Sequence, residues 1–260
     1  MTTTNPIEPL LTNDDPPPFE LANEAAPVPM LLTCDHASRR IPRRLGDLSL
    51  AERDLVRHIA WDIGAADVTR HMARGLNAPA ILAGYSRLVV DCNRHLHDSS
   101  LMPAVSDGTP IAANADLAPA GRQARIDALY DPYHQAITQR LDRFAAAGIR
   151  PVFLSIHSCT PEMNGRFRPW HVGVCWADDR RLAGPVMEAL SRDPDIVVGD
   201  NQPYNLDLLE DYTVPVHAIR RGLPYLQVEI RQDLIADPAG ARRWADLLLA
   251  ALRPALENLP

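Results

Sequence analysis

The chain has 260 residues, of which 46% are hydrophobic, and it carries a formal net charge of -7 at pH 7. This length and composition are sufficient for one domain with a substantial core. The acidic balance gives no general attraction to phosphate backbones or anionic lipid, so nucleic-acid and membrane partners are disfavoured. No stretch approaches the roughly 20 apolar residues of a spanning helix, and no leader is recognisable, so a cytoplasmic location is expected.

The beginning of the chain differs in composition from the rest. Residues 1–27 are rich in Pro, Asn, Asp and Thr and have no period that would bury one face. This composition predicts a flexible N-terminal arm over residues 1–27, followed by a single catalytic domain over residues 28–260. After a first strand-like run, Ser49 and Glu52 have the spacing of a capping box, which predicts the start of a helix.

That helical pattern continues towards Gly75 and is interrupted near residues 62–64. Short apolar runs predict further strands at residues 80–82, 88–91, 152–156, 172–176, 196–198 and 226–231. Helical patterns lie at residues 121–148, where Pro132 should split or kink the helix, at 180–191 and at 237–252. The alternation of strands and helices predicts an α/β fold with a mostly parallel sheet covered on both faces.

Residues 98–120 form a turn-rich excursion between these elements. An excursion of this length in a compact domain is typical of a lid or a substrate loop. Phosphate-binding loops rich in glycine are not found in the sequence, which disfavours nucleotide binding.

Two histidines follow or end strand-like apolar runs, His36 after residues 29–34 and His157 after residues 152–156. In an open α/β sheet the carboxyl ends of neighbouring strands converge on one crevice, so these imidazoles can meet. Hydrolytic zinc sites combine two histidines with one carboxylate and leave a position for water. We predict that His36, Asp62 and His157 hold one divalent metal ion, expected to be zinc. Asp35 and Asp91 remain alternatives for the carboxylate.

Glu229 lies inside the apolar run of residues 226–231. Burial raises the pKa of a carboxyl group, and a carboxylate so tuned can take a proton from metal-bound water and deliver it to a leaving nitrogen. We therefore predict that Glu229 is the catalytic base. An ion pair with a buried arginine such as Arg231 would explain the same position.

Several polar residues bracket the run at residues 88–91. The forked guanidinium of arginine can hold a substrate carboxylate or stabilise an oxyanion. We predict substrate contacts from Arg87, Asn93 and Arg94, with Arg87 also catalytic, and further substrate contacts from Ser158 and Arg231. Surface salt bridges would equally explain the arginines.

Taken together, these motifs resemble those of the N-formylglutamate amidohydrolase family from about Met30 to Leu234. The resemblance rests on five segments in order: Asp35–Ser38 (DHAS), His58–Ala65 (HIAWDIGA), Tyr85–Arg94 (YSRLVVDCNR), Ile156–Ser158 (IHS) and Val228–Leu234 (VEIRQDL).

This resemblance implies a three-layer α/β/α fold with a central mixed, mostly parallel sheet, similar to zinc carboxypeptidases and aspartoacylase-like deacylases. It implies hydrolysis of N-formyl-L-glutamate to formate and glutamate, the closing step of one histidine-degradation route. The expected partner is therefore a small acidic N-acyl amino acid. Relatives of that fold draw two metal ligands from a His-x-x-Glu pair. Arg39 stands where the Glu is expected, which is why Asp62 is the predicted substitute.

Two other functions fit the same residues. The chain could be a metallo-carboxypeptidase or amidase acting on peptide or cell-wall amides, or a catalytically inactive relative that binds a metal or a metabolite. The sequence does not indicate an oligomeric state.

Overall fold

The computed structural model describes residues 8–259. Within this range seven strands form one sheet in the order β1-β3-β2-β6-β11-β9-β10. These strands are β1 (Phe19–Ala22), β2 (Met30–Cys34), β3 (Ala80–Ala83), β6 (Val152–Cys159), β9 (Val172–Cys175), β10 (Val198–Asp200) and β11 (Tyr225–Arg231). Two hairpins lie outside the sheet, β4 (Val105–Ser106) with β5 (Thr109–Pro110) and β7 (Glu162–Met163) with β8 (Arg166–Phe167).

The α-helices are α1 (Glu52–Leu55), α2 (Ala65–Leu76), α3 (Ala112–Ala115), α4 (Pro119–Arg125), α5 (Asp131–Ala146), α6 (Ala183–Leu190), α7 (Thr213–His217) and α8 (Pro238–Glu257). A π-helical turn, Ile126–Tyr130, joins α4 to α5, so the helix predicted over residues 121–148 is interrupted just before Pro132. None of the helices within residues 8–259 is both long and apolar enough to span a membrane.

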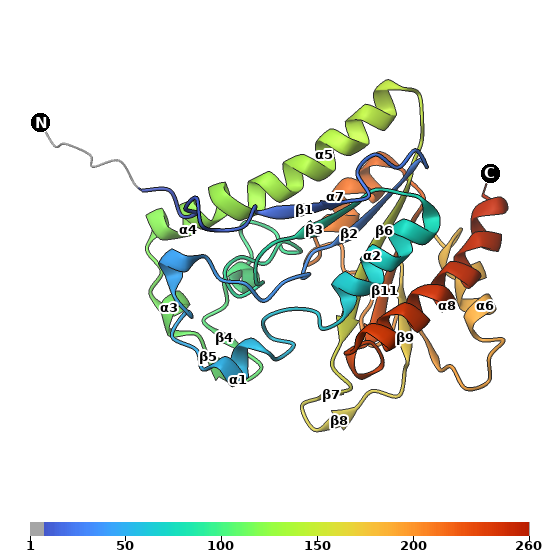
Figure 1. Cartoon of the computed structure of the whole chain (residues 1–260). Helices are drawn as coiled ribbons and strands as arrows, with labels where there is room; N and C mark the ends of the chain where they lie inside the picture. The colour runs from blue at the N-terminus through green and yellow to red at the C-terminus, as the bar shows by residue number, and fades with distance from the viewer. Residues whose placement is uncertain (1–7, 260) are drawn as a thin grey trace, which may run out of the picture.

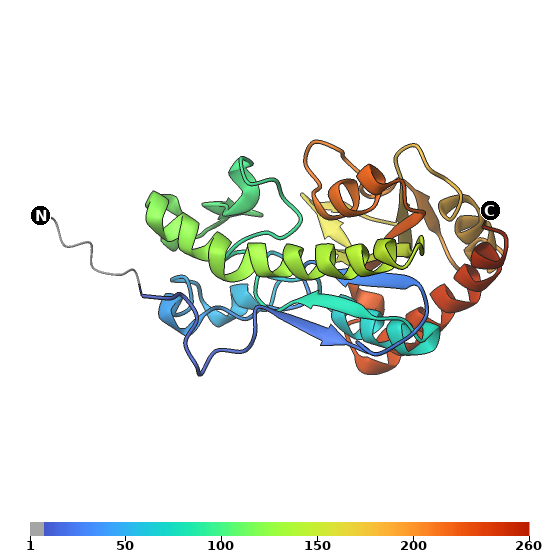
Figure 2. The same ribbon diagram turned by 90° about the horizontal axis from the view of Figure 1, so that it is seen from above.

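The sheet is mixed but mostly parallel. β2, β3, β6 and β11 run parallel to one another, as do β9 and β10, whereas β1 and β9 pair antiparallel with β3 and β11. Figures 1 and 2 show α2, α6 and α8 on one face of the sheet and α5 and α7 on the other. The predicted three-layer α/β/α fold with a central mixed sheet is confirmed.

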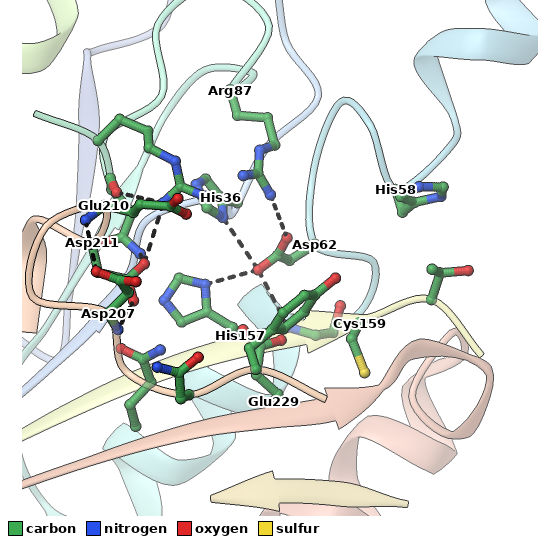
Figure 3. A pocket seen from close by; sticks show the side chains of 17 residues that line it. His36, His58, Asp62, Arg87, His157, Cys159, Asp207, Glu210, Asp211 and Glu229 are labelled. Atoms are coloured by element: carbon green, nitrogen blue, oxygen red, sulfur yellow. Dashed lines mark hydrogen bonds and ion pairs between the residues drawn. The ribbon is translucent and has the colours of Figure 1, made fainter. Parts of the chain in front are cut away.

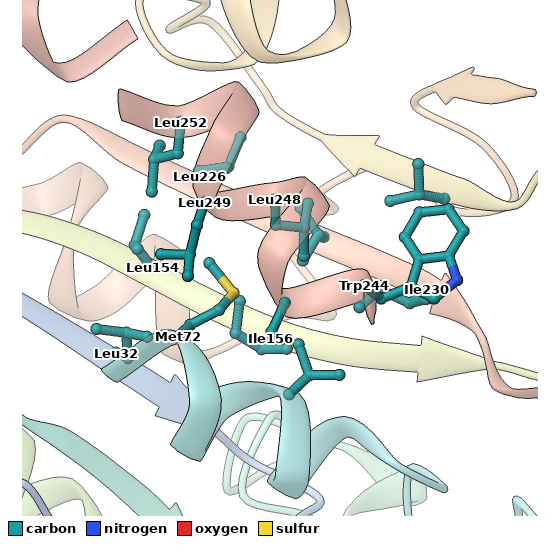
Figure 4. Packing of buried hydrophobic residues seen from close by; sticks show 14 of the residues in the cluster. Leu32, Met72, Leu154, Ile156, Leu226, Ile230, Trp244, Leu248, Leu249 and Leu252 are labelled. Carbon is teal, nitrogen blue, oxygen red and sulfur yellow. The ribbon is translucent and has the colours of Figure 1, made fainter. Parts of the chain in front are cut away.

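Alternation along the strands divides the core between the two faces, because successive side chains point in opposite directions. Leu32 of β2 and Leu154 of β6 pack against α2 and α8, where Figure 4 shows them close to Met72. Leu31 and Phe153, one residue earlier on each strand, pack on the α5 and α7 face. All four strand residues are fully buried, and each such side chain stabilises the fold by roughly 1.5–3 kcal/mol.

The segment after β3 was predicted to be a strand at residues 88–91, and this is wrong. Arg87 to Val89 form a turn in which the N–H of Val89 donates to the carbonyl of Ser86 at 2.9 Å. Leu88 and Val89 are nevertheless fully buried, because loops and the π-helical turn Ile126–Tyr130 form a second apolar cluster around them. The apolar run at residues 88–91 therefore predicted burial correctly, but it did not predict that the segment lies outside the sheet.

The predicted N-terminal arm contains a strand of the central sheet. β1 pairs antiparallel with β3 through residues 19–22, and Leu10 is buried in the second apolar cluster. Residues 1–7 lie outside the described residues. The division into an arm over residues 1–27 and a catalytic domain over residues 28–260 stays a prediction.

Helix ends follow the sequence signals unevenly. The break predicted near residues 62–64 is present, because α2 begins at Ala65 after Gly64 with a φ of 80°. The start of α8 is as predicted, since the Asp237 carboxylate accepts from the N–H groups of Ala239 and Gly240. The capping box is absent: α1 follows Ala51 without a side-chain cap, and Ser49 is left-handed with a φ of 63°.

Candidate active site

Three adjacent parallel strands deliver the predicted catalytic side chains to one edge of the sheet. His36 lies two residues beyond the end of β2, His157 lies near the end of β6, and Glu229 lies near the end of β11. Asp62 reaches the same place from the loop that precedes α2. The carboxyl ends of neighbouring parallel strands meet at one edge, so residues up to about 190 positions apart become neighbours.

The side chains of His36, Asp62 and His157 converge on one point. Asp62 Oδ2 lies 3.4 Å from Nδ1 of His36 and 3.0 Å from Nδ1 of His157. One donor atom from each of the three residues lies within 4.8 Å of the others, and all three residues are buried (Figure 3). Donors around a tetrahedral zinc ion are separated by roughly 3.3 Å, given bonds of about 2.0–2.1 Å. The donor set and its spacing therefore fit one divalent cation.

Two further carboxylates lie behind the histidine rings. Asp91 Oδ1 is 2.7 Å from Nε2 of His36. Nε2 of His157 lies 3.3 Å from Asp35 Oδ2 and 3.1 Å from the hydroxyl of Ser155. Metal-bound histidines are commonly oriented in this way through the second ring nitrogen, which leaves Nδ1 to face the metal. Asp35 and Asp91 thus occupy orienting positions, and Asp62 supplies the converging carboxylate.

The electrostatics of this cluster also favour a cation. Burial opposes protonation of both rings, yet the surrounding carboxylates outweigh it and raise the pKa of His36 and of His157. Burial opposes ionisation of Asp62, but the two imidazoles outweigh it and lower the pKa of that carboxyl. Asp35 Oδ2 is buried and makes no hydrogen bond of regular geometry within residues 8–259. The carboxylates around the two rings therefore favour positive charge between them.

Glu229 stands beside the cluster without a partner. It is in register with His157 across the parallel pair of β6 and β11, so both side chains point to the same face of the sheet. The side chain is buried, and within residues 8–259 it forms neither a hydrogen bond nor an ion pair. Burial raises the pKa of Glu229 to about 7. A carboxyl group with such a pKa can take up and release a proton near neutral pH.

A cavity of about 230 Å³ opens in front of these groups (Figure 3). Its wall contains the three candidate metal ligands, Glu229, and the polar residues Arg87, Asn93, Arg94, Ser158, Tyr204, Asp207, Glu210 and Asp211. A second cavity of about 390 Å³ shares His58, Arg87, Arg94 and Tyr204 with the first and is also lined by the excursion of residues 98–120. The excursion therefore borders the adjoining cavity and is not part of the lining of the first cavity.

Arg87 connects the carboxylates of the metal cluster. Its guanidinium donates to Asp91 Oδ2 at 2.7 and 3.1 Å, and Nη1 lies 3.6 Å from Asp62 Oδ1. About a quarter of the side chain, 27%, stays exposed, so one edge of this cation remains accessible from the cavity.

The other residues predicted to contact the substrate form hydrogen bonds or ion pairs within the protein. The amide of Asn93 and the guanidinium of Arg94 both donate to Asp211, at 2.9 and 3.2 Å. The hydroxyl of Ser158 donates to a backbone carbonyl at 2.9 Å. Arg231 is not among the residues that line the cavity, because its guanidinium pairs with Asp233 at 2.8 Å.

The sequence reasoning did not identify the loop that carries Asp207, Glu210 and Asp211. This loop has no hydrophobic period and no recognisable motif. Only its alternation of acidic with apolar residues could have indicated that it contributes to the site. Arg39, at the position where a His-x-x-Glu pair needs its Glu, lies outside the cavity and pairs with Glu52 at 2.6 Å.

The chain is similar to known proteins in both sequence and fold. Residues 28–236 match the N-formylglutamate amidohydrolase family. A curated relative, the N-formylglutamate deformylase of Pseudomonas putida, is 29% identical over 127 residues. That match covers 45% of this chain and 46% of the relative, so the chain spans about half the length of this curated relative.

Two solved structures are similar to the chain. A gene product of Agrobacterium tumefaciens has a TM-score of 0.91 and 36% identity, covering 95% of this chain and 98% of that one. The N-formylglutamate amidohydrolase of Ralstonia eutropha JMP134 has a TM-score of 0.66 and 22% identity, covering 92% and 97%. At this identity the second likeness supports the fold alone.

Proposed function

Because the chain belongs to the N-formylglutamate amidohydrolase family, we propose that it hydrolyses the amide bond of a small N-acyl amino acid with the help of one zinc ion. N-formyl-L-glutamate, which would yield formate and glutamate, is the first substrate to test. A role in cytoplasmic histidine degradation belongs to the same proposal and follows from the family resemblance alone.

The observation that supports this proposal most strongly is the convergence at the end of the sheet. Two imidazole nitrogens and one carboxylate oxygen lie within 4.8 Å of one another, and the unpaired Glu229 faces the same cavity. His36, Asp62 and His157 would hold the ion. When bound, zinc would polarise the amide carbonyl and acidify a water molecule.

The protein groups would perform the remaining chemistry. Glu229 would take a proton from the attacking water and deliver it to the leaving nitrogen, for which the raised pKa of about 7 is suitable. Arg87, beside Asp62, would stabilise the negative charge that develops on the carbonyl oxygen. Arg94, Asn93 and Ser158 would orient the substrate carboxylate through charge-assisted hydrogen bonds.

The direct test measures formate release from N-formyl-L-glutamate before and after removal of metal by a chelator. We expect turnover to stop on chelation and to return when zinc is added. Undiminished turnover by metal-free protein would exclude the mechanism.

The variant Glu229→Gln tests the base. It should lower kcat by about 10²- to 10⁴-fold, because the amide cannot accept the proton, while zinc content stays the same. Glu188→Gln, which changes an exposed carboxylate on α6, is the matched control and should keep full activity. A relative that only binds a metabolite would show no turnover to lose in either variant.

The adjoining cavity of about 390 Å³ favours one alternative, an amidase that acts on longer acyl or peptide substrates. A series of N-acyl glutamates with acyl chains of increasing length distinguishes the two. A formyl-specific enzyme loses activity as the chain grows, whereas an amidase for longer substrates gains it.

A further inference from the structure

Both arginines that line the metal pocket are already bound by carboxylates of the protein. Arg87 is bound to Asp91 and lies near Asp62. Arg94 is bound to Asp211, with 3.2 Å between Nη1 and Oδ1. A substrate carboxylate that enters the pocket must therefore compete with a carboxylate of the protein for either guanidinium of the lining.

Asp211 makes the closest imitation of a substrate carboxylate. Its Oδ1 accepts from the amide of Asn93 at 2.9 Å as well as from Arg94, and its Oδ2 accepts from the N–H of Asp207 at 3.0 Å. Asn93 and Arg94 are among the residues predicted from the sequence to bind the substrate. Figure 3 shows Asp211 beside Asp207 and Glu210, on the opposite side of the pocket from Asp62.

The ion pair is shielded from solvent. The side chains of Arg94 and Asp211 are 20% and 14% exposed, and the two residues also form an antiparallel backbone bridge. Partial burial weakens screening by water and salt, so this pairing has more effect on the charge of Arg94 than an exposed pair would have.

We propose that Asp211 is a specificity-determining residue that competes with a substrate carboxylate for Arg94 and so weakens selection for an acidic side chain. This inference rests on the proposed hydrolysis of an N-acyl amino acid. Removing the charge of Asp211 leaves Arg94 available, and the pocket then favours a substrate with a second carboxylate.

Two substrates of nearly identical shape isolate this effect. N-formyl-L-glutamate and N-formyl-L-glutamine differ at the end of the side chain, where one carries a charge and the other does not. The ratio of their kcat/KM values therefore measures charge preference and cancels changes in folding or metal content that affect both substrates alike.

In Asp211→Asn this ratio should move towards glutamate by about tenfold, mainly through a lower KM for N-formyl-L-glutamate. The shift should vanish when Arg94→Gln is combined with Asp211→Asn, because the guanidinium for which Asp211 competes is then absent. Glu210→Gln is the matched control: it removes the same charge from the same loop without a contact to Arg94, and should leave the ratio nearly unchanged.

An unchanged ratio in Asp211→Asn, or an equal shift in Glu210→Gln, would overturn the inference. If the wild-type protein hydrolyses neither compound, the proposed function fails, and the inference is then decided by calorimetric binding of L-glutamate and L-glutamine. Asp211→Asn should tighten the binding of glutamate relative to glutamine by about tenfold, and equal effects on both would contradict it.

Discussion

The Asp91 carboxylate joins three parts of the candidate site. Its Oδ1 lies 2.7 Å from the ring of His36 and accepts from the N–H of Asn93, and its Oδ2 binds Arg87. Burial disfavours the charged form of Asp91, but Arg87 and His36 outweigh it and lower the pKa of the carboxyl well below its usual range. Asp91 therefore orients the ring of His36 and carries negative charge behind it.

Replacing Asp91 with Asn should weaken zinc binding by about 10- to 100-fold, because the ring of His36 loses its anionic partner but remains present. Competition against a zinc-binding dye measures the affinity. Asp116→Asn, at an exposed aspartate, is the control and should bind zinc normally. A loss as large as that of Asp62→Asn would mean that Asp91 is itself a ligand.

Individual site residues differed in how far the sequence could predict them. His36, His157 and Glu229 each lie at or near the end of an apolar run, and strand topology alone brings such positions together. Asp211 lies 117 positions from Arg94 in a loop without periodicity, so their ion pair depends on tertiary structure that no local pattern encodes. The orienting roles of Asp35 and Asp91 depend likewise on ring geometry.

Among the local elements, the turn at Gly64 controls where Asp62 lies. Gly64 has a φ of 80°, and a Cβ at this position would lie 2.1 Å from the carbonyl oxygen of Ile235. The same turn separates α2 from the loop that carries Asp62. The site therefore depends on close contact between this turn and the segment that follows β11.

We expect Gly64→Ala to destabilise the protein and to weaken zinc binding together, because the chain must move away from Ile235. Gly46→Ala is the matched control, since Gly46 also has a positive φ, 59°, but has open space around it. Both variants should lose about 1–2 kcal/mol for the left-handed conformation, and Gly64→Ala roughly 1–3 kcal/mol more for the clash. Urea unfolding compares them, and equal losses would argue against a role for the contact.

At the level of elements, the sequence predicted most strands and the start of α8. Apolar runs and an Asp-Pro cap depend only on neighbouring residues, so a single sequence is sufficient to recognise them. It failed at residues 88–91, where burial comes from a cluster of loops and not from a sheet. It also missed β1, a four-residue edge strand without a fully buried residue in a segment rich in Pro, Asn and Asp. The sequence of a short segment can indicate that the segment is buried, but it does not indicate which strand the segment pairs with.

A feature of the whole molecule is a neutral histidine pair that joins two helices on the same face of the sheet. His134 of α5 and His217 of α7 are buried, with 3.0 Å between Nδ1 and Nε2. His134 Nε2 donates to the carbonyl of Cys92, so its Nδ1 accepts from His217. Burial lowers the pKa of His134 to about 4 and that of His217 to about 3.

This pair should make the fold sensitive to acid. Both pKa values lie below the ordinary 6.5, so below pH 6.5 the unfolded chain binds protons that the folded chain does not. The contribution of this pair to the free energy of unfolding should therefore be complete above pH 7. It should fall as the pH drops from about 6.5 towards 4, by up to about 1.4 kcal/mol per pH unit for each histidine.

Urea unfolding of metal-free protein between pH 7.5 and pH 5 measures this slope. His217→Gln should lower the slope below pH 6.5 by up to about 1.4 kcal/mol per pH unit, since one titrating group is removed and the amide can still donate to His134. His71→Gln, at a partly exposed histidine of α2, is a suitable control, and the slope in that variant should equal that of the wild type. An unaltered slope in His217→Gln would contradict this explanation.

The central claim is that His36, Asp62 and His157 bind one zinc ion together. Anomalous diffraction at the zinc edge from crystals of zinc-loaded protein tests it most directly. The expected result is one strong peak about 2.0–2.2 Å from Nδ1 of His36, Nδ1 of His157 and a carboxylate oxygen of Asp62. A peak at other residues, or none between these three, would contradict it.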